Sequence, residues 1–490
     1  MQFKTPYFQS FGPLLFGRSP KAAVDQMTGD GCLEKLSDLF KNLITKQAFA
    51  RPDKGVNSRE RELPPLVTFW AFVAQVLSVG CSCREIVRKV DAWWRLGQKR
   101  RQAEPLSASA YAQARVRLDK GTLKKIGHTL ADNLESNTLQ EETWLCGRSV
   151  KIIDGTTISM PDTEANQKAW PQTPSQKPGL GFPLMKLVGI FALSSGALLQ
   201  HATGNFFVHE LTLFQELWSH FKKGDVALGD RGFCSYLTLA GLFQRGVDSV
   251  MRLHGMRKVD FRKGRKLGPD DQIVTWRRPH PYQCPKSWSQ EAFLALPETF
   301  QVRIIRLQVA AKGFRTKTVL LATTLLDATL YPADAIRELY AQRWTIELHF
   351  HQIKTLLALD VLRCKSPEMI ERELLIHLIA YNLVRVLMQR SAHLHRVSIQ
   401  RLSFKGTLDT ARHFADVIHA AADTPRLQQK LIDEMYAIIA SDRLPIRPGR
   451  SEPRAKKRRP KNYQLLTKPR KSTGNLPRRN RPKKNVPKPA

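Results

Sequence analysis

The sequence predicts a helical region followed by a mixed α/β domain, and three observations support this fold class. Apolar residues recur at helical spacing between about residues 30 and 147. Short β-like runs begin near residue 148, and further along the chain they alternate with helix-like segments. Hydrophobic residues make up 42% of the 490 residues, which is enough to bury a core. This order of elements favours one α/β domain with a mixed sheet.

Residues 30–147 are expected to form a helical, DNA-binding domain. Apolar side chains follow the helical period through residues 67–77 and again through residues 86–94. Ser107 is a typical N-cap for a further helix, which carries Arg115. Basic side chains on such helices suit a DNA duplex, although no recognition-helix signature assigns a groove.

One stretch of this region, Leu63 to Cys83, carries no formal charge and approaches the length of a membrane span. Two prolines open the stretch, and polar residues and a glycine interrupt it. Charged pairs flank it at both ends. We therefore expect a buried helix of a soluble domain and no membrane partner.

The α/β domain is expected at residues 148–390. Its first strands are predicted at residues 150–154, 186–193, 197–203, 226–229 and 248–253, with helices near 209–221 and 235–245. A β-rich insertion is expected at about residues 255–300, where basic residues and short β-like pieces break the alternation. Strands near 302–309 and 316–322 follow, then helices near 332–357 and 369–388, and a C-terminal helical region at 391–442.

The charge is distributed unevenly, and it points to a polyanionic partner. The chain has 78 Lys and Arg against 43 Asp and Glu, a net charge of +35. The last segment, residues 443–490, carries 18 of these basic residues and one acid, and it is rich in proline. We expect this segment to be a disordered tail that forms no core. Residues 1–29 are expected to form an N-terminal lead before the helical domain. The tail is either a non-specific arm for phosphates or a solvated extension without a role in the activity.

The seven cysteines fit no disulfide framework, because their number is odd and their spacing irregular. No pairing of cysteine and histidine has the spacing of a zinc finger. Reduced thiols and the absence of a visible signal peptide lead us to expect a cytoplasmic protein.

Three acids stand out by their setting. Asp154 is expected at the end of the first strand, Asp230 closes a later strand, and Glu347 lies in the long helix near residues 332–357. Converging carboxylates can hold two divalent ions, about 4 Å apart, that clamp a phosphoryl transfer. Oxygen ligands suit Mg²⁺ or Mn²⁺. Each acid is also compatible with a turn or a solvated surface, and other acids compete for the role, namely Asp162, Asp225 and Glu210.

The long helix places four chemically distinct side chains on one face. Tyr340, Arg343, Glu347 and Lys354 fall within an arc of about 60° on a regular helix, along about 21 Å of its axis. A guanidinium and an ammonium bind phosphate, and the carboxylate between them could bind a metal. A solvated face with Arg343 and Glu347 paired at i, i+4 is the alternative.

The spacing Tyr340-x-x-Arg343-x-x-x-Glu347-(six)-Lys354 resembles the Y-R-E-K signature of bacterial DDE transposases of the insertion sequence 4 family. Residues 154–157 (Asp-Gly-Thr-Thr) and 228–233 (Leu-Gly-Asp-Arg-Gly-Phe) resemble the motifs of the first two acids, in the expected order. Residues 105–115 and 170–183 are also similar to family sequences, and the resemblance covers about residues 30–390.

This resemblance implies a ribonuclease-H-like catalytic domain, a mixed sheet flanked by helices with a β-rich insertion before the glutamate. It implies that Asp154, Asp230 and Glu347 bind the metal ions. Tyr340, Arg343 and Lys354 would hold a phosphate at the transposon end. The family's insertion carries a tryptophan that stacks on an unpaired base, for which the candidates are Trp276, preferred for its β-like run, and Trp288. A core tryptophan is the alternative for both.

The resemblance further implies cut-and-paste transposition by two-metal chemistry, with end nicking, hairpin formation and strand transfer. The expected partners are double-stranded DNA, as terminal inverted repeats and as target, and a second copy of the chain that joins two ends. The expected location is the bacterial cytoplasm, at the nucleoid. A catalytically idle DNA-binding relative and a metal-dependent nuclease without strand transfer are the alternatives.

Overall fold

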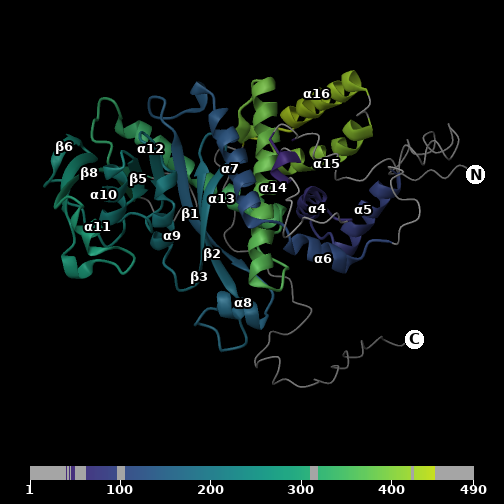
Figure 1. Cartoon of the computed structure of the whole chain (residues 1–490). Coiled ribbons are helices and arrows are strands. Elements are labelled where there is room, and N and C mark those ends of the chain that lie inside the picture. Colours follow the sequence, from purple (N-terminus) through teal and green to yellow (C-terminus); the bar gives the residue numbers. More distant parts are fainter. Residues whose placement is uncertain are drawn as a thin grey trace, which may run out of the picture.

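The computed structural model describes residues 40, 43–44, 46–49, 62–96, 105–308, 318–420 and 424–446 (Figure 1). Its α-helices are α4 (Pro65–Leu77), α5 (Cys83–Leu96), α6 (Ala108–Val116), α7 (Lys120–Ser136), α8 (Glu164–Ala169), α9 (Glu210–Glu216), α10 (Tyr236–Gln244), α11 (Gln290–Leu294), α12 (Ala333–Ala341), α13 (Thr345–His351), α14 (Pro367–Leu394), α15 (Phe404–Ala420) and α16 (Pro425–Ser441). The strands are β1 (Val150–Ser159), β2 (Leu184–Ala192), β3 (Leu198–Asn205), β4 (Val226–Gly229), β5 (Asp248–Arg252), β6 (Arg265–Gly268), β7 (Asp271–Arg277), β8 (Thr299–Gln308) and β9 (Thr318–Thr323).

These strands form a single mixed sheet in the order β3-β2-β1-β4-β5-β9-β8-β7-β6. The strands β1, β2 and β3 are antiparallel neighbours, whereas β4 lies parallel to β1 and β5 parallel to β4. The strand β9 then runs antiparallel to β5, and β8, β7 and β6 continue the antiparallel part. The fold is therefore the ribonuclease-H-like mixed sheet that the sequence predicted.

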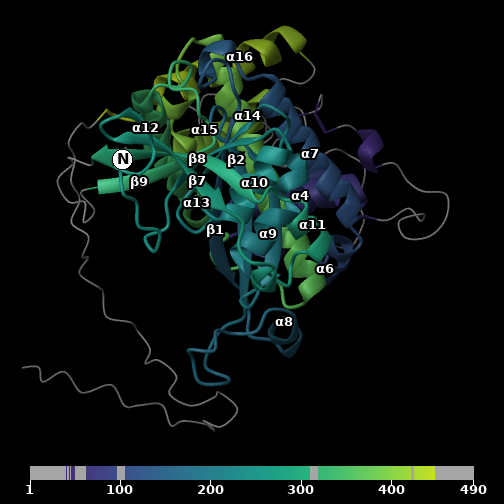
Figure 2. The ribbon, with the colours of Figure 1, turned by 90° about the vertical axis from the view of Figure 1, so that its left-hand side faces the viewer.

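Helices cover both faces of the sheet (Figures 1 and 2). On one face, α9 and α10 contribute residues such as Phe214 to a core that includes Ile153. On the other, α12, α13 and α14 contribute residues such as Ile346 to a core that includes Ile152. Because alternate residues of a strand point to opposite faces, the neighbours Ile152 and Ile153 belong to different cores.

The N-terminal helices pack directly on the α/β part of the molecule. Helices α4, α6 and α7 all contact α14, which runs beside them through the middle of the molecule (Figure 1). The uncharged stretch in α4 is buried by this packing, since Phe69, Ala71 and Val73 are 0% exposed. None of the helices in the described ranges combines the length and apolar character that crossing a bilayer requires.

The strand β1 is longer than predicted, so Asp154 lies within the strand and not at its end. The parallel partner β4 pairs with β1 only as far as Ile152. The antiparallel partner β2 continues to pair along β1 up to Ser159, opposite Leu184. Between Ile152 and the parallel bridge of Ser159 with Val361, β1 therefore pairs on one side only, which leaves that part of its other edge open beside the carboxyl end of β4.

The β-rich stretch at residues 255–300 does not stand apart from the sheet. Its strand β7 pairs with β8 from Asp271 opposite Ile305 to Arg277 opposite Thr299, and β6 extends the same edge. The stretch also contains α11, and β8 begins at Thr299. These strands thus lengthen the main sheet.

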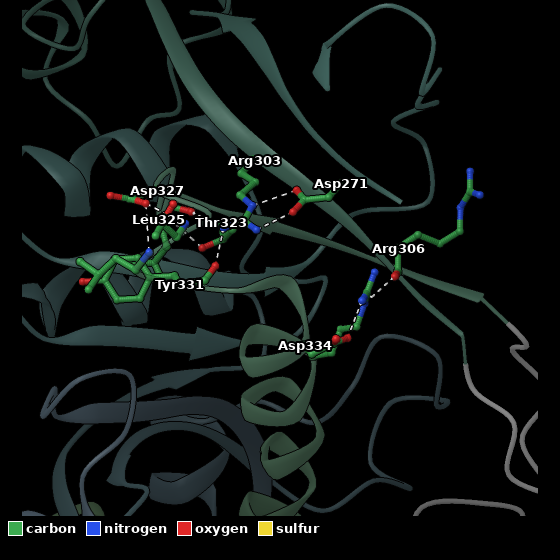
Figure 3. A network of polar contacts seen from close by, with 11 residues as sticks. Asp271, Arg303, Arg306, Thr323, Leu325, Asp327, Tyr331 and Asp334 are labelled. Atoms are coloured by element: carbon green, nitrogen blue, oxygen red, sulfur yellow. Dashed lines mark hydrogen bonds and ion pairs between the residues drawn. The ribbon is translucent and has the colours of Figure 1, made fainter. Parts of the chain in front are cut away.

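A buried ion pair links this added part to the helices that follow. Arg303 of β8 is 0% exposed, and its Nε donates to Oδ1 of Asp271 at 2.8 Å (Figure 3). Its Nη1 also donates to the carbonyl of Tyr331 at 2.7 Å. Because Tyr331 lies two residues before α12, the network fixes the start of the segment that carries Arg343 and Glu347.

Two expectations lie outside the described residues. These are the N-terminal lead at residues 1–29 and the basic tail from residue 447 onward. Within the C-terminal helical region, α15 and α16 pack against each other, and α16 contacts α14.

Candidate active site

Asp154 and Asp230 come from neighbouring parallel strands. The strands β1 and β4 pair with Ile152 opposite Leu228, and each aspartate follows two residues later. Asp154 follows Ile152 by two residues on β1, so its carboxylate points to the face covered by α12, α13 and α14. Asp230 comes directly after the end of β4, and its negative charge acts on Asp154. Adjacent strands lie about 4.8 Å apart, and the structure thus brings these two predicted residues together.

The ionisation of Asp154 reflects this crowding. Burial raises the pKa of Asp154 to about 6, and the negative charges of Asp230 and Glu210 act in the same direction. A hydrogen bond from the Gly155 amide, at 2.8 Å, and the charge of Arg343 lower it. A cation placed between the two aspartates would favour their charged forms.

The helical segment opposite these strands is not the single regular helix predicted for residues 332–357. Between α12 and α13 lies the 3₁₀ segment η5 (Gln342–Trp344), and α13 continues into the π-helical segment η6 (Gln352–Leu356). A 3₁₀ segment winds more tightly and a π segment more loosely than an α-helix, so a constant angle per residue does not apply. Tyr340 and Arg343 are buried while Glu347 is exposed, so the four residues do not share one exposed face.

Arg343 is buried beside the acids, with an unsatisfied donor. Its Cζ lies 4.9 Å from the ring centroid of Trp344 and 6.0 Å from that of Tyr340. Its Nε has no hydrogen-bond partner among the residues that the structure describes, and its Nη2 lies 3.8 Å from Oε1 of Glu347. This contact is the i, i+4 pair of the alternative interpretation, but its length leaves the guanidinium incompletely bound. A phosphate oxygen could accept the hydrogen bonds that the guanidinium of Arg343 still has to donate.

Burial raises the pKa of the Tyr340 hydroxyl to about 12, although the nearby charge of Arg343 lowers it. The hydroxyl therefore stays protonated at neutral pH and can donate a hydrogen bond. Because Tyr340 is only 5% exposed, its ring also contributes to the core that holds α12 on the sheet.

Lys354 connects the π-helical segment to β1. Its Nζ donates to Oγ1 of Thr156 at 3.1 Å and to the carbonyl of Thr157 at 3.0 Å. An ammonium has three N–H groups, so one remains for an anion. Single-turn π segments occur frequently at functional sites, and this one places Lys354 over the strand that carries Asp154.

Among the competing acids, Glu210 lies close to Asp154. A Cβ atom at Gly155 would lie 2.9 Å from Cδ of Glu210, so the glycine makes room for this carboxylate. In contrast, Asp225 pairs with Lys151 at 2.7 Å, and Asp162 accepts a hydrogen bond from Gln167 at 2.8 Å. No local sequence signal favoured Glu210 over the other two, because its contact with Gly155 forms only in the folded chain.

The two tryptophans considered for base stacking differ in exposure. Trp276 is 8% exposed, and the guanidinium of Arg257 lies 4.0 Å from its ring centroid. Trp288 is half-buried and contacts Trp218 edge to face, with 5.8 Å between ring centroids. Trp276, the tryptophan that the sequence favoured, is therefore buried beneath Arg257, and Trp288 is the more accessible of the two.

In the part of the chain that the structure describes, no three His, Cys, Asp or Glu side chains are close enough to hold a metal ion. Asp154 and Asp230 nevertheless form a pair of oxygen donors with excess negative charge, which suits a hard divalent cation. Glu347 is 56% exposed and is bound only loosely, by the 3.8 Å contact to Arg343. These residues therefore fit a divalent metal by their chemistry.

Two family models match the chain. Residues 145–383 match the transposase DDE domain, and residues 31–126 match the N-terminal region of the insertion element 4 transposase. The matched ranges cover the sheet up to α14 and most of the helices packed on it. A ribonuclease-H-like sheet with these matches defines a DDE transposase, a class that generally uses divalent metal ions.

Curated relatives agree with this class. The transposase InsG of insertion sequence element IS4, from Escherichia coli K12, is 30% identical over 412 residues, which are 83% of this chain and 88% of that protein. The transposase of insertion sequence element IS421, from Escherichia coli, is 40% identical over 73 residues, 15% of this chain and 19% of that protein. The chain belongs to the insertion sequence 4 family, and it is a DNA transposase.

One solved structure shows a weak overall similarity to this chain. The piggyBac transposase in a synaptic complex with hairpin DNA aligns over 87% of this chain and 86% of its own, with 12% identity and a TM-score of 0.40. A similarity this low adds nothing to the assignment.

Proposed function

We propose that this transposase moves its element by cut-and-paste transposition, with Asp154, Asp230 and Glu347 as the ligands of two divalent ions, Mg²⁺ or Mn²⁺. The observation that carries the proposal is the position of Asp154 and Asp230 side by side on the face that also holds Arg343. Bound there, such ions activate water and stabilise the charge of the transferred phosphate. No side-chain nucleophile is required.

Tyr340, Arg343 and Lys354 would bind the phosphate at the transposon end, as in the Y-R-E-K subgroup. The unsatisfied Nε of Arg343 and the remaining N–H of Lys354 supply charged donors, and the protonated hydroxyl of Tyr340 supplies a neutral one. Trp276 and Trp288 remain the candidates for stacking on an unpaired base, and Trp288 is favoured by its exposure.

The proposed reaction has four steps. Water attacks the phosphorus at each element end, the bond to the 3′-oxygen breaks, and a 3′-hydroxyl and a 5′-phosphate result. The 3′-hydroxyl attacks the phosphodiester of the opposite strand at the element end, the bond from that phosphorus to the 3′-oxygen of the flanking DNA breaks, and a hairpin forms on the element end while the flanking DNA leaves with a 3′-hydroxyl. A second water attacks the hairpin phosphodiester and breaks its bond to the 3′-oxygen, which restores the 3′-hydroxyl and leaves a 5′-phosphate. The freed 3′-hydroxyl then attacks a phosphodiester of the target DNA, and the 3′-oxygen of the target strand leaves. The partners are the terminal inverted repeats, the target DNA and a second copy of the chain, in the bacterial cytoplasm at the nucleoid.

A strand-transfer assay tests this proposal. Labelled DNA with the sequences that flank the gene is incubated with a target plasmid, with and without Mg²⁺. Wild type is compared with Glu347→Gln and with Glu338→Gln, an exposed glutamate of α12, as the matched control. We expect joined products from wild type and from the control, and none from Glu347→Gln. Cut ends without joined products would indicate a nuclease, and binding without cutting an idle relative.

A further inference from the structure

The side chain of His349 is buried on one flank of α13. Its imidazole stacks on the ring of Phe191 in β2, with 5.4 Å between ring centroids and 14° between ring planes. Successive residues turn an α-helix by about 100°, so Glu347 lies about 160° away from His349 around the axis of α13. The helix contacts β1, and in the sheet β2 and β4 lie on opposite sides of β1. Because His349 lies on the β2 side, Glu347 lies on the flank toward β4, which Asp230 follows.

A hydrogen bond holds His349 to α14. Nδ1 of His349 lies 3.1 Å from the hydroxyl oxygen of Tyr381, a buried residue of α14. That hydroxyl donates its single hydrogen to the carbonyl of Gly196 at 2.6 Å, so toward His349 it can only accept. Nδ1 of His349 therefore carries a hydrogen and donates it to Tyr381.

The surface that receives His349 is itself fixed. Asn382, the next residue of α14, accepts from the amide of Leu198 at 3.0 Å and donates to its carbonyl at 2.9 Å, which ties the helix to the start of β3. Gly196 lies in the turn before β3 with a φ of 66°, and a Cβ atom there would lie 2.6 Å from Cε1 of His349. Glycine thus allows the turn to approach the imidazole closely, and His349 binds to a part of the fold that is held in place.

The backbone of α13 restrains its rotation less firmly. The helix has seven residues and lies between the 3₁₀ segment η5 and the π-helical segment η6, where the winding changes. The carboxylate of Glu347 is held by a loose contact, 3.8 Å from Nη2 of Arg343. A rotation of α13 by about 10° would move a carboxylate that lies about 6 Å from the axis by about 1 Å. A displacement of this size can slow a reaction about a hundredfold.

We propose that His349 is a positioning residue for Glu347. Its hydrogen bond to Tyr381 fixes the rotation of α13, and this rotation directs the carboxylate of Glu347 toward the paired aspartates. His349 acts through the helix, because its buried ring lies on the opposite flank from the acids. The inference rests on the proposed function, since it requires that Glu347 binds a metal ion.

Binding of Mn²⁺ to the full-length protein tests the proposal. The protein is bound to DNA ends that are already cut on both strands, so that no cleavage accompanies binding, and the free ion is measured by electron paramagnetic resonance. His349→Phe keeps a flat ring on Phe191 but loses the donor, whereas His349→Asn keeps a donor and loses the ring. We expect at least tenfold weaker Mn²⁺ binding for His349→Phe, and binding within about threefold of wild type for His349→Asn. The reverse order would show that His349 acts by packing alone and would overturn the proposal.

Tyr381→Phe removes the same hydrogen bond and leaves His349 in place. It should weaken Mn²⁺ binding as much as His349→Phe, and the double variant should bind no more weakly than either, because all three lack one shared interaction. Tyr111→Phe is the matched control, since Tyr111 is also fully buried and its hydroxyl donates to Gln75 at 3.0 Å. This control should bind Mn²⁺ as wild type does, with a loss of stability in urea like that of Tyr381→Phe. Equal Mn²⁺ binding by the two tyrosine variants would contradict the proposal.

Activity and DNA binding give further readouts. At limiting Mg²⁺, His349→Phe should nick uncut DNA about a hundredfold more slowly than wild type. Without divalent ions it should bind the DNA ends as wild type does, because Arg343 and Lys354 are unchanged. A loss of DNA binding equal to the loss of Mn²⁺ binding would indicate a general defect of the site and would overturn the positioning role.

Glu347→Gln distinguishes failure of this inference from failure of the proposed function. It should weaken Mn²⁺ binding at least tenfold. If it does so while His349→Phe and Tyr381→Phe bind Mn²⁺ as wild type does, the positioning role of His349 is wrong and the proposed function stands. If Glu347→Gln itself binds Mn²⁺ with the affinity of wild type, the metal-binding role of Glu347 is wrong and the inference fails with it.

Discussion

The ammonium of Lys354 donates a hydrogen bond to the hydroxyl of Thr156 at 3.1 Å, and this contact ties the π-helical segment η6 to β1. This hydrogen bond helps to fix the distance between the helical segment that carries Glu347 and the strand that carries Asp154. The same ammonium is proposed to bind phosphate, so its two roles are separable by substitution.

Replacing Lys354 by Met should weaken DNA-end binding and reduce the salt dependence of binding by about one unit of slope, because one phosphate contact is lost. Thr156→Val removes one hydrogen bond and keeps the ammonium. It should lower the free energy of unfolding by about 1 kcal/mol with an unchanged slope. Filter binding over a salt series, with urea unfolding, measures both. Equal slopes for wild type and Lys354→Met would argue against a phosphate role.

Arg343→Ala should weaken binding to ends that carry a 5′-phosphate, and again lower the salt slope by about one. The reason is the buried guanidinium, which has an Nε without a partner. The matched control is Arg412→Ala, on the surface of α15. If the slope stays at the wild-type value, Arg343 pairs with Glu347 and does not contact a DNA phosphate.

The raised pKa of Asp154, about 6, predicts a dependence of stability on pH. The folded state holds the proton more tightly than the unfolded state, so stability falls as pH rises from about 4 to about 6. Asp154→Asn has no carboxyl group to ionise at this position, so the variant does not lose this stability as the pH rises. Without divalent ions, the variant should therefore melt at a higher temperature than wild type at pH 7.5, and the difference should shrink near pH 4. The exposed Asp162→Asn serves as control, and a difference that does not vary with pH would contradict the assignment.

The buried pair of Arg303 and Asp271 predicts a large effect on stability. Arg303→Met leaves an uncompensated buried carboxylate and should cost about 3–5 kcal/mol. The double variant Arg303→Met with Asp271→Leu should recover much of this loss, because neither charge then remains buried. Chemical denaturation measures wild type, Arg303→Met, Asp271→Leu and the double variant. A double variant as unstable as the sum of both single variants would show that the two residues act independently.

Much of this structure could be predicted from the sequence. The alternation of strands and helices predicted the mixed sheet, and the motifs around Asp154 and Asp230 predicted two acids that the structure places on neighbouring strands. The spacing of Tyr340, Arg343, Glu347 and Lys354 was recognisable without a structure. These features depend on local patterns, which a single sequence retains.

Other features depend on tertiary contacts that local patterns do not show. The length of β1 follows from its pairing with β2, and the union of β6 and β7 with the main sheet follows from pairing with β8. The 3₁₀ and π segments change the rotation per residue along the helical segment that holds Arg343. A helical wheel with a constant angle therefore assigns its residues to the wrong faces. Likewise, the position of Glu210 against Gly155 requires two segments more than fifty residues apart to meet.

Metal-dependent nicking of DNA that carries the element ends is the measurement that tests the central claim most directly. The assay compares wild type with Asp154→Asn, Asp230→Asn and the control Asp162→Asn. The account predicts Mg²⁺-dependent nicks at defined positions for wild type and for Asp162→Asn. It predicts that Asp154→Asn and Asp230→Asn still bind the DNA but lose at least a thousandfold in nicking rate. Nicking by either of these two variants at the wild-type rate would contradict the claim that the paired aspartates hold the catalytic ions.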